Sequence, residues 1–228
     1  MVVAHNQEQL QILVENCGQF RGSKAPRGYP DSLALCIIDS IQSTGVRYSS
    51  VRKVVDSYGQ YRRTQDADPT TDGARELIAT FDELGGPEVW AQQIGNRNKT
   101  STKAGAPLKA EAIRDAAKAL TDVDVTTTAE LRDAASSESA LSRVESAWCG
   151  VVAQRSGVTW HYVQMLAGTP GVKPDRMIIR FVADSLALPR SSVTPKFALD
   201  IVKAAAESMS MSPSDLDHGI WQYQRRRR

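Results

Sequence analysis

The sequence predicts an all-α protein, because helical periodicity extends over nearly the whole chain and no segment alternates as a strand would. Apolar residues recur three and four positions apart in successive segments, and short polar connections join these segments. The composition agrees with a globular fold, since 41% of the residues are hydrophobic and 24% are charged. The sequence has no repeat of fixed period, so a solenoid is not expected. No long linker divides the 228 residues, so if the chain forms two lobes, they would have to pack together.

The first helices follow from the apolar patterns. Residues 33–42 are almost continuously apolar and predict a buried helix. Residues 51–58 and 77–84 each place four apolar side chains on one helical face. The segments after them predict a short helix over 87–94, a flexible polar loop over 96–107 and a helix over 107–120.

Several helices in the second half of the chain are predicted to begin at capping residues or prolines. Thr127 and Glu130 form a capping box, and Pro174, Pro195 and Pro213 suit the first turns of helices, where a missing N–H costs nothing. Together with the periodicity, these signals predict helices at 139–155, 158–167, 173–186, 196–207 and 214–223. On the last of them, His218 is expected to pack with Trp221.

Charge and cysteine content indicate which partners and which cellular compartment to expect. The net charge is only +2, but basic residues gather in three places, at 97–109, 173–180 and 225–228. Such clusters are typical either of a nucleic-acid face or of a solvated helix surface. We expect no membrane span, no secretion signal and no metal site, because the three cysteines are far apart. The expected compartment is the cytoplasm, with association with the nucleoid in a bacterium.

The hairpin at 165–177 joins two predicted helices through the sequence Thr-Pro-Gly-Val-Lys-Pro. The first N–H groups of a helix and its dipole can hold an anion, and a glycine lets a phosphate approach the backbone. The candidate DNA contacts are therefore Thr169, Gly171, Val172, Lys173 and Arg176. Packing without any ligand is the alternative for so short a turn.

The segment TPGVKPDRMIIRFV resembles the hairpin of the helix-hairpin-helix DNA glycosylase superfamily, whose type member is endonuclease III and whose hairpin typically reads Leu-Pro-Gly-Val-Gly. Two earlier segments resemble the family in the same order. One is the helix pair from residue 33 to residue 58, with Ser40, Gln42 and Thr44 at matching positions. The other is the Ile-Gly loop followed by Lys109, Ala110 and Glu111, with a longer loop here.

The resemblance implies two helical lobes that bind duplex DNA and flip a base out of the stack. One lobe would cover 30–186 and carry the hairpin, and the other would be built from 1–29 and 187–228. Gln42 resembles a residue that fills the gap in the duplex, although an exposed helix-end side chain is the alternative. A monovalent cation at the hairpin is compatible with the motif. No iron–sulfur cluster is expected, because no cysteine follows Cys149.

The sequence departs from the family at the catalytic positions. Thr194 stands where active members carry an aspartate, and Asp175 stands where some carry a lysine nucleophile. Threonine bears no charge and cannot stabilise the cation that forms as a base departs. Asp39 and Asp175 are the candidate replacements. The alternatives are a buried helix-to-helix tie for Asp39 and a first-turn dipole partner for Asp175.

Three functions remain open from the sequence. The first is recognition of an altered base, with excision by a divergent DNA N-glycosylase, a hydrolase of base excision repair. The second is a catalytically degenerate binder of a DNA structure. The third is a helical protein-interaction module that does not bind nucleic acid.

Overall fold

The computed structural model describes residues 5–227, and they form an all-α fold, as predicted. Two compact units make up the chain. The central unit is Gly28–Thr169, and the terminal unit combines the described parts of Met1–Arg27 and Pro170–Arg228. Two peptide connections, at residues 27–28 and 169–170, join them.

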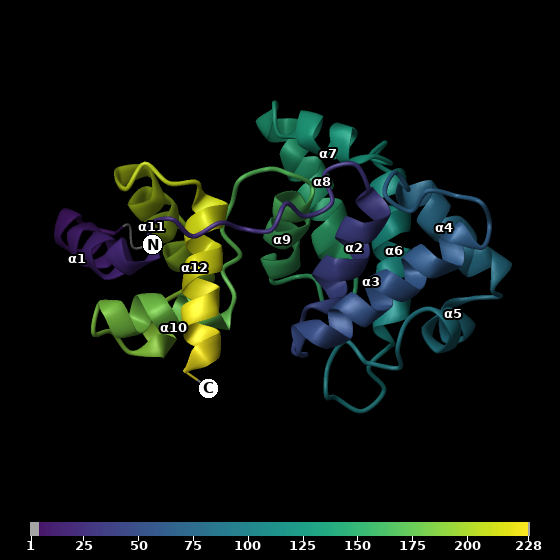
Figure 1. Ribbon diagram of the computed structural model, residues 1–228, viewed down its shortest axis with the longest axis horizontal. Helices are drawn as coiled ribbons and strands as arrows, with labels where there is room; N and C mark the ends of the chain where they lie inside the picture. Colours follow the sequence, from purple (N-terminus) through teal and green to yellow (C-terminus); the bar gives the residue numbers. More distant parts are fainter. Residues whose placement is uncertain (1–4, 228) are drawn as a thin grey trace. The chain divides into compact units, whose positions relative to one another are not determined.

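The central unit consists of eight α-helices (Figure 1), which are α2 (Leu33–Gln42), α3 (Tyr48–Arg63), α4 (Ala74–Glu83), α5 (Pro87–Gln93), α6 (Lys109–Thr121), α7 (Thr128–Ala134), α8 (Glu138–Gly150) and α9 (Val158–Leu166). Helix α2 has the predicted bounds, and every one of its residues is buried. It packs against α3, α4, α6 and α9, which explains why its sequence lacks a polar face. The long loop before α6 folds back on itself, with Thr100 N–H donating to Pro107 O at 3.0 Å.

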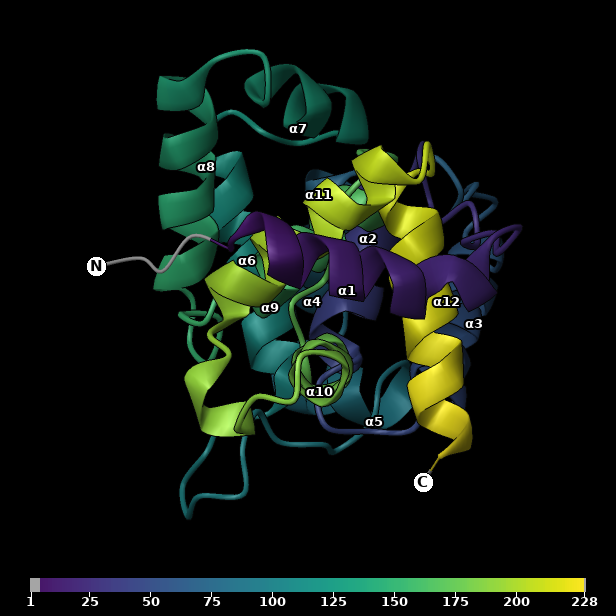
Figure 2. The ribbon, with the colours of Figure 1, turned by 90° about the vertical axis from the view of Figure 1, so that its left-hand side faces the viewer.

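The terminal unit consists of α1 (Gln7–Cys17), α10 (Arg176–Ser185), α11 (Pro195–Ser208) and α12 (Pro213–Arg226), with the short 3-10 turns Gly18–Phe20 and Arg190–Ser192. Figures 1 and 2 show α10 beside α12, in agreement with their packing. Phe20 and Phe181 meet edge to face, with ring centroids 5.4 Å apart, and Tyr223 of α12 joins them. Segments from both chain ends therefore share one hydrophobic core.

The division between the units lies at Thr169, whereas the sequence placed it near residue 186. Helix α10 belongs to the terminal unit because Val172, Ile178 and Phe181 are buried in its core. The two helices of the predicted hairpin, α9 and α10, thus lie in different units.

The predicted helix starts are mostly confirmed. Thr127 and Glu130 form the capping box of α7, and Pro195 and Pro213 are the first residues of α11 and α12. Pro174 is an exception, since α10 begins at Arg176 with Asp175 as its N-cap. Helix α1 was not predicted from the sequence, although its Asn6–Gln9 capping box is a readable signal.

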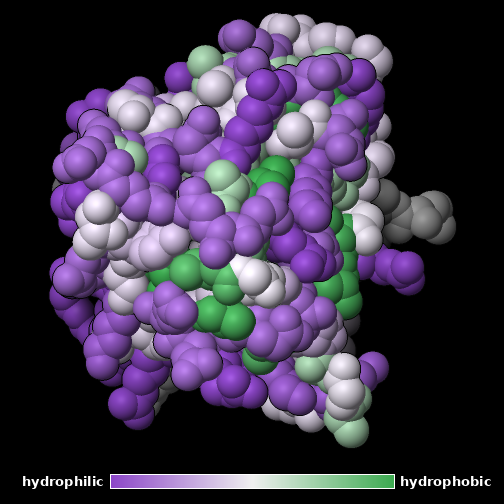
Figure 3. Space-filling view, turned by 90° about the vertical axis from the view of Figure 1, so that its right-hand side faces the viewer, coloured by the Kyte–Doolittle hydropathy of each residue, from purple (hydrophilic) through white to green (hydrophobic). Residues whose placement is uncertain are grey.

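No helix within residues 5–227 is long and apolar enough to cross a membrane. On the face of the molecule shown in Figure 3, hydrophobic residues form small areas surrounded by hydrophilic ones.

Candidate nucleic-acid interface

The turn that was predicted to hold a phosphate makes its hydrogen bonds inside the terminal unit. The Gly171 N–H donates to Ser214 Oγ at 3.0 Å, and the Lys173 N–H donates to Asp217 Oδ1 at 2.9 Å. Ser214 and Asp217 lie three residues apart on α12, so they meet the turn together. These two amides are therefore engaged by the protein's own side chains instead of being open to a phosphate.

Asp217 is a buried carboxyl group in this contact. Burial raises the pKa of Asp217 to about 7, and the nearby Asp175 adds to the rise, while the Lys173 N–H and the Lys173 charge oppose it. Asp217 therefore holds its proton to a much higher pH than an ordinary carboxyl group does. Ser214 and Asp217 were not predicted from the sequence, although their i, i+3 spacing behind Pro213 is a readable signal.

The other residues predicted to act in the hairpin differ in their burial and in their hydrogen bonds. Val172 is fully buried in the terminal core, and Thr169 N–H donates to Gln164 O at 3.0 Å. The Asp175 carboxylate accepts from the Met177 and Ile178 amides at 2.7 and 3.3 Å, so it caps α10, which was the structural alternative. Of the predicted contacts, Arg176 is exposed to solvent.

Asp39 is buried with partners, the other alternative given for this residue. Its Oδ2 accepts from the hydroxyls of Tyr29 and Tyr48, each at 3.0 Å, and Tyr162 is a further hydrogen-bond partner. Burial, followed by the Asp39 charge, raises the pKa of Tyr48 to about 12. All three phenols stay neutral donors at physiological pH, so the carboxylate is held in a tyrosine-lined core site.

Tyr29 reaches this site because Gly28 allows a close turn. Gly28 has a φ of +72°, and a Cβ there would lie 2.5 Å from Leu166 O. The adjacent Tyr29 N–H donates to that same carbonyl oxygen at 2.7 Å. A side chain at residue 28 would therefore disturb the approach of Tyr29 to α9.

Gln42 does not have the exposed position that a wedge between base pairs requires, since it is fully buried. Its Oε1 accepts from Asn96 Nδ2 at 3.2 Å, and its Nε2 is buried without a hydrogen-bond partner. Lys109, also buried, donates from Nζ to the carbonyls of Gln42 at 2.9 Å and Thr44 at 2.6 Å. The lysine thus neutralises the C-terminal end of α2, and the loop before α6 covers the glutamine.

Thr194 is the exposed N-cap of α11, where its hydroxyl accepts from Phe197 N–H at 3.1 Å. Threonine is a good cap and supplies no charge. Of the catalytic candidates, then, Asp39 is fully buried, and Asp175 uses one carboxylate oxygen to cap α10.

Positive charge is concentrated in the terminal unit. This unit contains 13 Lys and Arg against 8 Asp and Glu, whereas the central unit contains 15 against 18. The ion pairs among the described residues of the terminal unit include Lys24–Asp215, Arg190–Asp184 and Lys196–Asp200. Within the described residues, the arginines without a carboxylate within 4.0 Å include Arg176, Arg180, Arg225 and Arg226. They belong to two helices that pack together, α10 and α12.

The end of α12 combines arginines with aromatic rings. The Arg225 Cζ lies 5.2 Å from the centroid of the Trp221 ring, and the Arg227 Cζ lies 5.3 Å from that of Tyr223. His218 stacks on Trp221, as predicted, with ring centroids 5.9 Å apart and 19° between the planes. Basic and aromatic side chains interleaved on one element are typical of nucleic-acid contacts.

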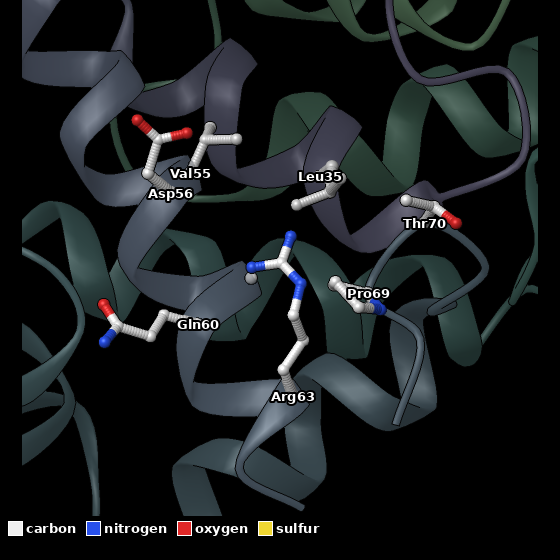
Figure 4. A pocket seen from close by; sticks show the side chains of 8 residues that line it. Leu35, Val55, Asp56, Gln60, Arg63, Pro69 and Thr70 are labelled. Carbon is white, nitrogen blue, oxygen red and sulfur yellow. The ribbon is translucent and has the colours of Figure 1, made fainter. Parts of the chain in front are cut away.

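Two surface depressions in the central unit involve none of the predicted site residues. One, of about 410 Å³, lies between α3, the start of α2 and the Pro69–Thr70 loop, and Figure 4 shows the Arg63 side chain extending into it toward Leu35. The other, of about 520 Å³, follows the end of α8 around Cys149 and Arg155. No group of three or more metal-ligating side chains is found among residues 5–227.

Comparison with known proteins places the chain in a family. No curated protein and no solved structure matches it. Residues 11–225 match a family described as a domain of unknown function, DUF8548, and this match covers both units except at the extreme ends. The chain therefore belongs to the DUF8548 family.

Proposed function

We propose that this protein binds duplex DNA through the terminal unit and recognises an altered or unusual base without excising it. The observation that carries the proposal is the excess of arginine on α10 and α12, where Arg176, Arg225 and Arg226 are exposed without a carboxylate partner in the described structure. Unpaired surface arginines attract phosphates and release the counterions of DNA. The resemblance of three segments to the helix-hairpin-helix glycosylases supports the choice of DNA.

Recognition is preferred over excision because the two candidate catalytic carboxylates, Asp39 and Asp175, form hydrogen bonds within the protein. Asp39 is engaged by tyrosine hydroxyls in the central core, and Asp175 caps its own helix. A catalytic carboxylate has to reach the sugar or the attacking water at hydrogen-bond distance. The second function left open by the sequence, a catalytically degenerate DNA binder, is therefore the one we adopt.

Binding to a short duplex should weaken steeply with salt. If Arg176, Arg180, Arg225 and Arg226 each contact a phosphate, the affinity should fall about 100-fold between about 50 and about 200 mM salt. Fluorescence anisotropy of a labelled duplex measures this dependence. Replacing Arg176 or Arg226 by Gln should reduce the slope of log K against log salt by about 1. The matched controls Arg190→Gln and Lys196→Gln, whose cations are already paired with carboxylates, should change it much less. Absent or salt-independent binding would refute the proposal.

Duplexes containing deaminated, alkylated or oxidised bases should remain intact after incubation with the protein. Alkaline cleavage followed by gel electrophoresis reveals abasic sites. If such sites form and then disappear in Asp39→Asn or Asp175→Asn, the protein is a glycosylase and our preference for recognition is wrong. Tighter binding to one of these duplexes than to the unmodified one is the expected positive result.

A further inference from the structure

The depression of about 410 Å³ beside α3, which we call the α3 depression, has an apolar floor and one cationic group. Leu35 near the start of α2, Val55 on α3 and Pro69 line it with hydrocarbon. Figure 4 shows the Arg63 side chain extending from the end of α3 toward Leu35. The volume lies within the range of about 300–1,000 Å³ that is usual for ligand pockets. The size and the lining are those of a site for a small molecule.

The floor of the α3 depression contains Gly59, a glycine well inside a helix. Such a glycine lowers helix stability relative to alanine, because its backbone loses more freedom on folding. Gly59 does not have a positive φ. A Cβ at this residue would lie 3.5 Å from Arg63 Nη2 and 3.7 Å from Pro69 Cγ, which are ordinary contact distances. Neither backbone conformation nor crowding therefore requires the glycine, and the missing side chain leaves space beside the guanidinium.

The side of the depression that faces α3 is fixed to the start of α2. The buried Ser32 hydroxyl donates to Pro69 O at 2.8 Å and to Asp72 O at 3.0 Å. The same oxygen accepts from the Leu35 N–H at 3.3 Å and caps α2. Pro69 and Leu35 are thus held in place by one side chain, and a preformed site loses little freedom when a ligand binds.

The two arginines that end α3 differ in their partners. Arg62 donates to the Asp72 carboxylate at 2.7 and 3.1 Å, so its charge is compensated inside the fold. No carboxylate oxygen of residues 5–227 lies within 4.0 Å of the Arg63 guanidinium. The carboxylate of Asp68 is instead engaged by Thr70, whose N–H and hydroxyl donate to it at 2.9 and 2.7 Å. The N–H donors of Arg63 therefore remain available to an acceptor in the depression.

We infer that the α3 depression binds a small apolar monocarboxylate, whose carboxylate pairs with Arg63 and whose hydrocarbon part covers Gly59, Leu35 and Pro69. A planar guanidinium forms two parallel hydrogen bonds with a carboxylate. The apolar floor gains free energy when hydrocarbon covers it. Asp56 lines the depression two helical turns before Arg63 and repels a carboxylate there, so the acid binds in one orientation. The site lies within the central unit and is independent of the DNA contacts proposed for the terminal unit.

The experiment titrates the full chain with hexanoate and phenylacetate, and with their uncharged analogues hexanamide and phenylacetamide. Chemical-shift changes of the backbone amides in NMR spectra give both the affinity and the location. At least one acid should bind with a Kd of about 0.1–1 mM and shift the amides of Gly59 and Arg63. Each amide should bind about 10-fold more weakly than its acid. The inference is overturned if neither acid binds below about 10 mM, or if acid and amide bind alike.

Two arginine variants on α3 test the cation. Arg63→Gln should weaken the binding of the acids about 10-fold or more and leave that of the amides nearly unchanged, since only the acids lose a charged partner. The matched control is Arg52→Gln, which removes an exposed charge from the same helix outside the depression. That variant should bind the acids as the original chain does. Equal losses in the two variants would show general attraction of anions and would overturn the assignment of Arg63.

Gly59→Ala separates a binding role of the glycine from a structural one. The added methyl group should raise the Tm of the central unit by about 1–4 °C, because alanine is the better helix former. The same methyl group occupies the floor and should weaken the binding of the acids about 10-fold. A glycine that serves packing alone would give a lower Tm on substitution. A lower Tm, or undiminished binding, would therefore overturn the assignment of Gly59 to the floor of the site.

Discussion

Replacing Asp72 by alanine is expected to lower the free energy of unfolding of the central unit by about 3–5 kcal/mol. The Asp72 carboxylate accepts from Arg62 Nε at 2.7 Å, from Arg62 Nη2 at 3.1 Å and from the Tyr58 hydroxyl at 2.8 Å. The side chains of Arg62 and Asp72 are 12% and 5% exposed, so the pair is largely removed from water. Removing the carboxylate leaves a guanidinium and a phenol desolvated without their acceptor.

The position of Asp72 explains why the loss should be large. Its backbone carbonyl accepts from Ser32 Oγ at 3.0 Å and from Ala34 N–H at 3.1 Å, so the residue connects the loop before α4 to the start of α2. The hydrogen bond to Asp72 also raises the pKa of Arg62, as expected for a stabilised cation. Helix α2 is buried along its entire length. A displacement of its first residues would therefore disturb the packing of the central core.

Urea unfolding followed by tryptophan emission measures this loss, because Trp90, Trp148 and Trp160 are all buried in the central unit. The matched control is Asp115→Ala, which removes the carboxylate of the more exposed pair with Arg114 in the same unit. That change should cost no more than about 0.5 kcal/mol. A loss below about 1 kcal/mol for Asp72→Ala would show that the buried pair does not anchor α2.

Asp217→Asn is expected to remove a pH-dependent loss of stability from the terminal unit. The folded-state pKa of Asp217 is about 7, against an ordinary value of 3.8, so the folded state holds one more proton than the unfolded state between those values. The stability from this group is fully present below pH 4 and is lost as the pH rises through 7. The difference corresponds to at most about 4 kcal/mol. Asparagine cannot ionise and keeps an oxygen for the Lys173 N–H.

The measurement is the difference in unfolding free energy between Asp217→Asn and the original chain from pH 4.5 to pH 8 (about one measurement per half unit). The variant should gain stability relative to the original chain as the pH rises. The control on the same helix is Asp215→Asn, since Ala25 N–H and Lys24 lower the pKa of Asp215. The stability from the Asp215 carboxylate is already fully present above its ordinary pKa and is lost only at lower pH, so the difference for Asp215→Asn should stay nearly constant from about pH 4.5 to about pH 8. A flat profile for Asp217→Asn would contradict the burial of this carboxyl group.

The contact between Asp217 and the turn also bears on DNA binding. A carboxylate and a hydroxyl of α12 occupy the Lys173 and Gly171 amides, the donors that the sequence assigned to a phosphate. The turn therefore positions α10 against α12, and the arginines of these helices supply the charge that we propose for DNA. The hairpin contributes to that function by placing the arginines.

By itself, the sequence determined the all-α class, the bounds of α2 and the caps of α7 and α11, because apolar spacing and capping are local properties of a few residues. It also identified Asp39 as a carboxyl group that needs explanation. Only the tertiary structure decided what surrounds that group, since Tyr29, Tyr48 and Tyr162 come from separate segments of the chain.

The tertiary structure likewise decided which groups form hydrogen bonds with the hairpin amides and with Gln42. A glycine turn presents the same amides in sequence whether they bind a phosphate or a side chain, and Asp217, 44 residues away, engages one of them here. Gln42 ends an apolar helix and was compared with an exposed residue, yet Asn96 of the loop before α6 and Lys109 at the start of α6 form hydrogen bonds with it. Local chemistry fixes which groups can form hydrogen bonds, and the packing of distant segments selects their partners.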